Sequence, residues 1–176
     1  MQAEDEQVAL FDESGSPSGV APRGIVYRDG LWHASTAVLV RSGDGRQVYV
    51  HRRTPEKLIF PGLYDCWAGG VLGPGEEPDT AAARELAEEL GITGAALTPI
   101  ERYAYIGAGQ RYHVFAYETR WDGPIVWQPE EVAWGAWVPL ADLRSMLADP
   151  ARWPFAPDGR LGIDRWLAAQ AGSRTP

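Results

Sequence analysis

Apolar and polar positions alternate over several short segments of the chain, the pattern typical of β-strands. The first, residues 8–11, runs into Asp-Glu-Ser-Gly-Ser-Pro-Ser-Gly, a sequence rich in turn formers. Residues 34–41 and 47–53 flank Ser42-Gly43-Asp44-Gly45, so we expect them to form a β-hairpin in the core of a sheet. Further strands are predicted at residues 67–72, 97–106, 111–120 and 132–138.

A different periodicity predicts a helix between Pro78 and Gly91. Pro78 and Asp79 are typical of a first turn, and Gly91 stands where a helix commonly ends. Apolar side chains recur there at helical spacing and form one face, made of Ala83, Leu86, Ala87 and Leu90. Residues 139–148 and 162–171 are predicted to be closing helices, and residues 1–5 and 172–176 to be flexible ends.

The order of these elements indicates one α+β domain over residues 1–176. Strands and helices alternate irregularly, and neither an internal repeat nor a long linker divides the chain. With 176 residues, 45% of them apolar, the chain can bury a core of its own. We therefore expect a mixed sheet with helices packed on it.

Charge and cysteine content narrow the range of possible partners, metal sites and compartments. Lys and Arg number 16 against 24 Asp and Glu, a net charge of −8, and no basic run is long enough to follow a phosphate backbone, so no nucleic acid partner is expected. Cys66 is the only cysteine, which excludes an internal disulfide and a cysteine-based zinc site and favours a reducing, cytoplasmic compartment. No apolar run approaches the roughly 20 residues of a membrane span.

Three glutamates of the predicted helix form the main chemical signal. Glu85, Glu88 and Glu89 share one helix face, roughly opposite the apolar one. Ionised carboxylates this close repel each other unless water or cations neutralise them, and oxygen clusters suit Mg²⁺ or Mn²⁺. Taken alone, the same pattern is also typical of an ordinary solvated acidic face.

The residues around this helix follow a fixed spacing. Gly70 is followed after five residues by Glu76 and, after seven more, by Arg84-Glu85-Leu86-Ala87-Glu88-Glu89-Leu90-Gly91-Ile92. Every specified position of the Nudix box matches, so the chain resembles the Nudix hydrolase family. The resemblance implies an α/β/α sandwich in which a mixed, curved sheet lies between helices.

The resemblance also implies roles for the residues of the box. Glu85, Glu88 and Glu89 correspond to metal-binding carboxylates, Glu89 first among them, and a carbonyl of Gly69 or Gly70 is a further candidate ligand. Glu76 and Arg84 correspond to a structural ion pair that joins the loop to the helix, and Gly70 and Gly91 complete the box. A general base or extra ligand lies outside the box in relatives that have one, and the candidates here are Glu130 and Glu131. A solvated turn is the alternative for both.

This chemistry suits hydrolysis of a diphosphate. Its oxygens repel an incoming hydroxide, and divalent ions neutralise that charge and lower the pKa of the attacking water. The expected function is divalent-metal-dependent cleavage of a diphosphate linkage in a nucleoside diphosphate derivative or a nucleoside di- or triphosphate. The leaving group is left open, and a homodimer is conceivable because homodimers are common among relatives.

A segment ahead of the box resembles the branch related to isopentenyl diphosphate isomerase. The segment is Arg52-Arg53-Thr54-Pro55-Glu56-Lys57-Leu58-Ile59-Phe60-Pro61-Gly62. The resemblance makes Arg53 and Lys57 a clamp for the substrate diphosphate. The alternative is that both are surface charges at the end of a strand.

An isomerase or a silent nucleotide sensor is the alternative function. The isomerase's catalytic cysteine aligns with Gly69 and its next metal-binding histidine with Val71, whereas Cys66 lies three residues too early. His33 matches one metal-binding histidine, but its partner position is Val26, so we expect His33 to be packed or hydrogen-bonded. A silent sensor commonly lacks a box carboxylate, and none is missing here.

Aromatic residues near the box could stack on a base, although most aromatics in such a chain are core. The candidates are Tyr64, Trp67 and Tyr112, and Cys66 is expected to be a small buried hydrophobe.

Overall fold

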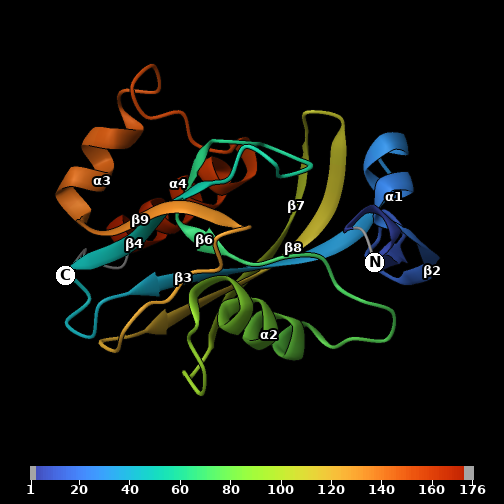
Figure 1. Cartoon of the computed structure of the whole chain (residues 1–176), viewed down its shortest axis with the longest axis horizontal. Coiled ribbons are helices and arrows are strands. Elements are labelled where there is room, and N and C mark those ends of the chain that lie inside the picture. The colour runs from blue at the N-terminus through green and yellow to red at the C-terminus, as the bar shows by residue number, and fades with distance from the viewer. Residues whose placement is uncertain (1–2, 173–176) are drawn as a thin grey trace.

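The computed structural model describes residues 3–172, which form one mixed sheet with helices on both of its faces (Figure 1). The strands are β1 (Gln7–Phe11), β2 (Pro17–Pro22), β3 (His33–Arg41), β4 (Gln47–Arg53), β5 (Tyr64–Asp65), β6 (Trp67–Ala68), β7 (Thr98–Gly107), β8 (Gln110–Arg120) and β9 (Val132–Pro139). The helices are α1 (Arg23–Asp29), α2 (Pro78–Leu90), α3 (Leu140–Leu147) and α4 (Pro157–Gly172), preceded by a 3₁₀ turn at Ala3–Asp5.

Strands β3 and β4 pair with different sets of strands, so the sheet has two halves. β3 runs parallel to β8, from the pair His33 and Tyr112 to the pair Arg41 and Arg120, and β8 pairs with β7. β4 pairs with β9 instead. The prediction of a hairpin in the sheet core is therefore only partly right, because β3 and β4 pair at Arg41 and Val48, beside the turn, and then separate.

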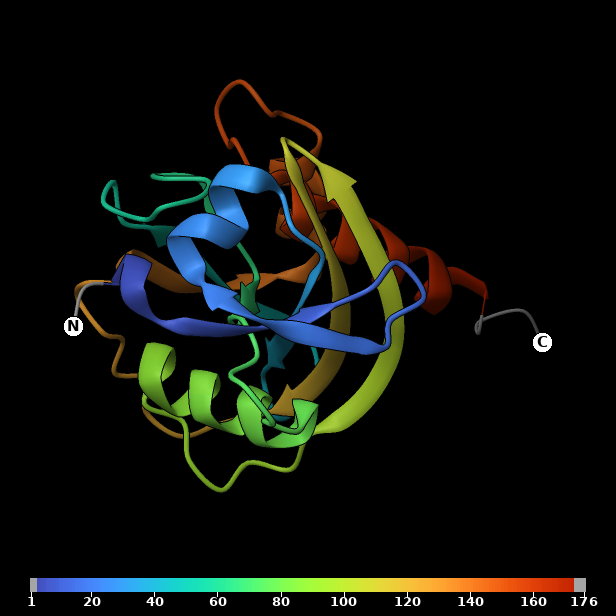
Figure 2. The same cartoon turned by 90° about the vertical axis from the view of Figure 1, so that its right-hand side faces the viewer.

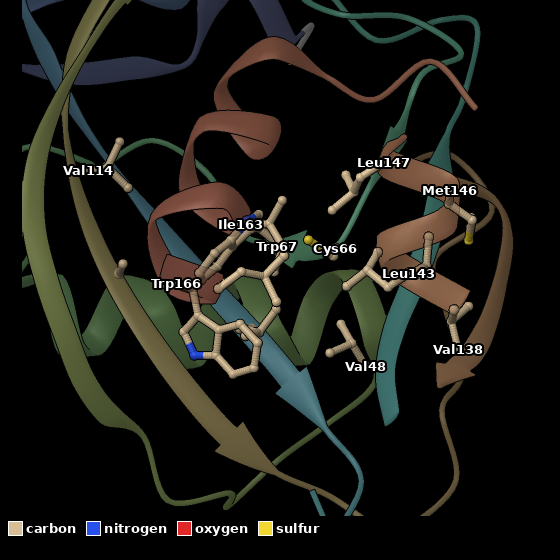
Figure 3. Close-up of a cluster of buried hydrophobic side chains, with 14 of the residues drawn as sticks. Val48, Cys66, Trp67, Val114, Val138, Leu143, Met146, Leu147, Ile163 and Trp166 are labelled. Atoms are coloured by element: carbon tan, nitrogen blue, oxygen red, sulfur yellow. The ribbon is translucent and has the colours of Figure 1, made fainter. Parts of the chain in front are cut away.

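The two faces of the sheet carry separate hydrophobic clusters. The view of Figure 2, turned by 90°, shows that the long strands curve, and α2 and α4 lie on opposite sides of the sheet in Figure 1. Leu39, Val48 and Trp67 pack with Ile163 and Trp166 of α4, and Figure 3 shows part of this cluster. On the other face Val38, Tyr49 and Tyr117 pack against Ala82 and Leu86 of α2. The expected α+β fold, an α/β/α sandwich, is confirmed.

Several local predictions differ from the structure. The predicted turn of residues 12–19 ends earlier, because β2 already begins at Pro17, and neither β2 nor α1 was predicted. The predicted strand 67–72 is broken after Ala68 by Gly69 and Gly70, and Val71 makes only an isolated bridge to Ser35. Helix α4 begins five residues before the predicted start, at Pro157.

The chain ends also differ from the expectation. Residues 3–5, expected to be flexible, form the 3₁₀ turn, and Gly172 ends α4. The rest of the ends expected to be flexible, residues 1–2 and 173–176, lies outside the described residues. No helix within residues 3–172 is both long and apolar enough to cross a membrane.

Candidate active site

Helix α2 presents the three box carboxylates, but it does not expose them equally. Pro78 opens the helix, and Gly91 ends it in the left-handed region with φ of 67°. Glu85 and Glu89 are only 8% and 5% exposed, whereas the side chain of Glu88 is 53% exposed. The acidic face expected from the helix pattern is thus covered at two of its three positions.

The backbone at Gly69 and Gly70 covers the two buried carboxylates. Gly69 N–H donates to Glu89 Oε2 at 3.1 Å, and a Cβ at Gly70 would lie 2.4 Å from Glu85 Oε1. The Gly70 carbonyl accepts hydrogen bonds from Thr36 N–H and from the Ser35 hydroxyl. Of the two carbonyls considered as metal ligands, the structure therefore favours that of Gly69.

Arg84 joins the loop before α2 to the helix. Its Nε and Nη2 donate to the two carboxylate oxygens of Glu76, at 2.8 and 3.0 Å, and Glu76 also accepts from Gly73 N–H. Its Nη1 donates to Glu85 Oε1 at 2.7 Å and to Glu88 Oε2 at 3.3 Å. This geometry fits the structural role that the box implies for Glu76 and Arg84.

Lys57 lies between the helix and the segment that follows residue 126. Its ammonium group pairs with Glu131 and lies 3.9 Å from Glu89 Oε1. Burial lowers the pKa of Lys57 to about 8, and burial raises the pKa of Glu89 to about 7 although Lys57 opposes that shift. Glu131 thus reaches the carboxylates of α2 through Lys57, whereas Glu130 is exposed and holds Thr54 by its backbone carbonyl.

Arg53 stands at the end of β4 and hydrogen-bonds to the loop of residues 54–63. Its Nε donates to the Phe60 carbonyl at 3.2 Å and its Nη2 to the Ile59 carbonyl at 3.1 Å. The neighbouring Arg52 holds Gly62 in the same loop. Arg53 therefore has an established role in loop structure, and it also borders the cavity described next.

A cavity of about 430 Å³ joins these groups, and we call it the main cavity. Arg53, Lys57, Glu85, Glu88, Glu89, Gly69, Glu130 and Glu131 all line it. Arg23 and Tyr27 of α1 line it too, and sequence reasoning missed both because no strong helix pattern marks α1. The candidate metal ligands, the candidate general bases and the candidate phosphate-binding residues thus all line one cavity.

The remaining candidates lie in different places. His33 and Tyr112 line the main cavity with their rings 4.9 Å apart, and burial lowers the pKa of His33 to about 4. Tyr64 packs against Trp134 and Trp153, outside the residues that line the main cavity. Cys66 and Trp67 belong to the core on the α4 side, and burial raises the pKa of the Cys66 thiol.

The donor chemistry of the site fits a hard divalent cation. Burial raises the pKa of Glu85 and of Glu89 although Arg84 and Lys57 oppose these shifts, and a divalent ion, which prefers oxygen ligands, would compensate such carboxylates further. Over residues 3–172, no three His, Cys, Asp or Glu side chains already form a group that could hold a metal. Lys57 and Arg84 are instead the cations among these carboxylates.

Known proteins match most of this chain in sequence. The family model described as the NUDIX domain matches residues 31–159. The uncharacterized Nudix hydrolase orf19 of Rhodococcus erythropolis is 52% identical over 165 residues, which are 89% of each chain.

Solved structures share the fold at lower identity. DR0079 from Deinococcus radiodurans has a TM-score of 0.78 at 23% identity and covers 91% of this chain and 98% of its own. The NUDIX domain of Shewanella oneidensis NrtR, solved with ADP ribose, has a TM-score of 0.59 at 18% identity, with 80% and 88% covered.

Proposed function

The chain belongs to the Nudix hydrolase family, whose members act on pyrophosphate bonds, and on that premise we propose divalent-metal-dependent cleavage of a small-molecule diphosphate. The substrate class is a nucleoside diphosphate derivative or a nucleoside di- or triphosphate. The observation that carries the proposal is the buried pair Glu85 and Glu89, held under a glycine backbone in the same cavity as Lys57 and Arg53. A reducing cytoplasmic location and a homodimer stay predictions.

The residues that would hold the metal are Glu85, Glu88, Glu89 and the carbonyl of Gly69. When bound, Mg²⁺ or Mn²⁺ supplies neutralisation of the diphosphate charge and a lower pKa for the attacking water. The net charge of −8 makes such neutralisation necessary for any polyanionic substrate.

The protein's own cations and bases complete the arrangement. Arg53 and Lys57 line the main cavity and would bind the phosphates, Arg53 by its planar fork and Lys57 by a point charge. Glu131 is our candidate general base, because it lies beside Lys57 in the same cavity as the α2 carboxylates.

The isomerase alternative lacks its proton-transfer groups. Gly69 and Val71 offer neither a thiol nor an imidazole, and the thiol of Cys66 is buried in the core on the α4 side. The silent-sensor alternative is disfavoured since Glu85, Glu88 and Glu89 are all present.

A substrate panel in ¹⁸O-water tests the proposal. ADP, ATP, UDP-glucose and ADP-ribose, the last because it is the compound in the NrtR structure, are incubated with Mg²⁺ or Mn²⁺. We expect a phosphate or nucleotide product that carries solvent oxygen, and no product when a chelator is in excess. Hydrolysis that persists in excess chelator would contradict the metal requirement. In a separate incubation of isopentenyl diphosphate in deuterated water, deuterium uptake into carbon would support the isomerase.

Glu89→Gln is the matching variant, and Glu77→Gln at the start of the same helix is its control. Loss of one buried metal ligand should lower turnover at least about 100-fold, because metal affinity and water activation both depend on it. Glu77 is exposed and makes no side-chain cap, so its variant should keep wild-type turnover. Circular dichroism checks that both variants are folded, and a folded Glu89→Gln protein with full activity would remove Glu89 from the site.

A further inference from the structure

A second, smaller cavity lies between the sheet and the first turn of α4, and we call it the inner chamber. It has a volume of about 60 Å³, and its polar lining comes from Ser35, Arg53, Asp65, Tyr103, Tyr112 and Asp158. Ser35, Arg53, Gly69, Tyr112 and Asp158 line the main cavity as well. The two spaces therefore adjoin, and a molecule held at Lys57 has a neighbouring polar space for its other end.

Two acidic side chains contribute acceptor oxygens to this chamber. The Tyr112 hydroxyl donates to Asp158 Oδ2 at 2.6 Å, while Asp158 Oδ1 is buried and has no hydrogen-bond partner within residues 3–172. Asp65 is 5% exposed, and its Oδ1 accepts from the backbone N–H groups of Cys66 and Trp67. A buried acceptor without a donor is costly, so Asp158 Oδ1 is a place for a donor from outside the chain.

Neither acid of the chamber forms an ion pair. Within the described residues, no ion pair joins Asp65 or Asp158 to a basic side chain, and the Arg53 guanidinium, which also lines the chamber, donates to the carbonyls of Ile59 and Phe60. Burial, with Asp158 as the second cause, raises the pKa of Asp65 to about 8, so Asp65 is neutral at neutral pH. A group that enters with N–H or O–H donors gains a hydrogen bond at Asp158, whereas an anion meets the Asp158 carboxylate in a confined space.

Aromatic rings line the main cavity, and one of them, Tyr112, lines the inner chamber as well. The ring of His33 lies 4.9 Å from that of Tyr112 and 5.8 Å from that of Tyr27, and all three residues line the main cavity. These rings offer flat apolar contacts to the part of a substrate that links its two ends.

We propose that the inner chamber binds the non-phosphate end of the substrate and selects a compact, neutral or cationic group with N–H or O–H donors against an anionic one. Asp158 is the residue that makes the selection, since its free Oδ1 faces no donor of the chain. This inference rests on the proposed function, because it takes the diphosphate to lie at Lys57 and Arg53.

A series of alkyl diphosphates of equal chain length tests the chamber directly. The series ends in a methyl, hydroxyl, ammonium or carboxylate group, so each compound has one phosphate end and one test end. Affinity is measured by isothermal titration with Mg²⁺, and turnover by phosphate release. Wild-type protein should bind the ammonium compound at least about tenfold more tightly than the carboxylate compound, with the hydroxyl compound between them.

Asp158→Asn should reduce that preference to within about threefold, because the amide lacks the charge but its oxygen can still accept from Tyr112. Asp164→Asn is the matched control: Asp164 is an exposed acid of the same helix, paired with Arg160, and its variant should keep the preference. Equal wild-type affinities, or a preference that survives in folded Asp158→Asn, would overturn the inference. If the variant does not fold, the wild-type order alone decides.

The two readouts separate this inference from the proposed function. Turnover without the expected order of affinities would keep the hydrolase and remove the subsite. The expected order without turnover would keep the subsite and remove the hydrolase activity on these compounds.

Discussion

The positions of the Glu85 and Glu89 carboxylates depend on glycine at residues 69 and 70. A Cβ at Gly70 would lie 2.4 to 2.7 Å from the three terminal atoms of Glu85, and one at Gly69 would lie 2.0 Å from the Thr36 carbonyl. Glycine is thus required at residue 70 because the backbone passes directly over the Glu85 carboxylate, and at residue 69 because the backbone lies against Thr36, and not because of an unusual φ at either residue. The position of the candidate metal ligands is fixed from the loop as much as from the helix.

Gly70→Ala should therefore lower the turnover rate more than it lowers the stability of the fold. The added methyl group displaces the Glu85 carboxylate, and a shift of about 1 Å in such a site can lower turnover on the order of 100-fold. Gly73→Ala in the same loop is the control, because its nearest contact, Glu76 Oε2, would lie at an ordinary 3.4 Å. Equal kcat values for the two folded variants on the best substrate would show that the close approach at Gly70 has no catalytic consequence.

Arg53 holds the 54–63 loop and is also proposed to bind phosphate. Comparison with the neighbouring Arg52 separates these two roles. Arg53→Ala should raise KM about 30-fold or more, which corresponds to the ~2–5 kcal/mol cost of losing one partner of a buried charge pair. Arg52 also holds a carbonyl of the 54–63 loop, at Gly62, but it lies over Tyr64 and outside the main cavity. Arg52→Ala should loosen the loop and leave KM within about threefold of wild type. Similar KM values for the two variants would mean that Arg53 acts only on the loop.

At the level of elements, the end of α2 and the segment after residue 125 behave as one unit. Val126 N–H donates to the Leu90 carbonyl and Gln128 N–H to the Glu89 carbonyl, each at 3.0 Å. These bonds satisfy two of the carbonyls that a helix end leaves open. They also place Glu131 near Lys57, so the helix end positions a residue about 40 positions away in sequence.

Gly91→Ala tests this connection between α2 and the 126–131 segment. Alanine at φ of 67° costs about 1–2 kcal/mol, and its Cβ would also lie 2.8 Å from the Val126 carbonyl, so the total loss of stability should exceed about 2 kcal/mol. Gly94→Ala, at φ of 71° with no atom within 4 Å of the added Cβ, should lose only about 1 kcal/mol. Urea unfolding measures both losses, and equal values would contradict a tight contact at Val126.

The elements that the sequence predicts well are those with strong local patterns. Helix α2 was predicted with its observed bounds because proline and glycine mark its ends, but of the predicted apolar face only Leu86 and Leu90 are fully buried and Ala83 is exposed. Helix α1 escaped prediction: it has only seven residues, contains Gly24, and Pro22 gives it no side-chain cap. Tyr27 and Arg23 of the cavity were missed with it.

The burial of the site could not be predicted from helix periodicity. That pattern places Glu85 and Glu89 opposite the apolar face, and a helix alone would leave them in water. The backbone at Gly69 and Gly70 and the 54–63 and 126–131 segments cover them, and these contacts join residues that are distant in sequence. The box predicts which residues form the site, but only the fold shows which of them are shielded from water.

For the whole molecule, several buried titratable groups make stability depend on pH in opposite directions. Burial lowers the pKa of His33 to about 4 and of His51 to about 3, so the unfolded chain binds more protons below pH 6.5 and stability falls there as pH falls. Burial raises the pKa of Asp65 to about 8 and of Glu89 to about 7. For these acids the folded chain binds more protons, so stability falls as pH rises up to the folded pKa.

The difference between wild type and Asp65→Asn isolates Asp65 between pH 6.5 and 8. In this range the last part of the histidine titration and proton loss from buried Lys57 raise stability with pH, whereas Asp65 and, up to about pH 7, Glu89 lower it. Asp65 by itself should cost wild-type protein roughly 2 kcal/mol of unfolding free energy across the range, at ~1.4 kcal/mol for each pH unit. Asp65→Asn should remove this loss, because the amide oxygen can still accept from the Cys66 and Trp67 backbone but has no proton to release. Asp164→Asn, at an exposed position of α4, should follow the wild-type pH dependence. Urea unfolding at a series of pH values measures all three proteins, and the same pH dependence in wild type and Asp65→Asn would show that Asp65 is already ionised in the folded chain.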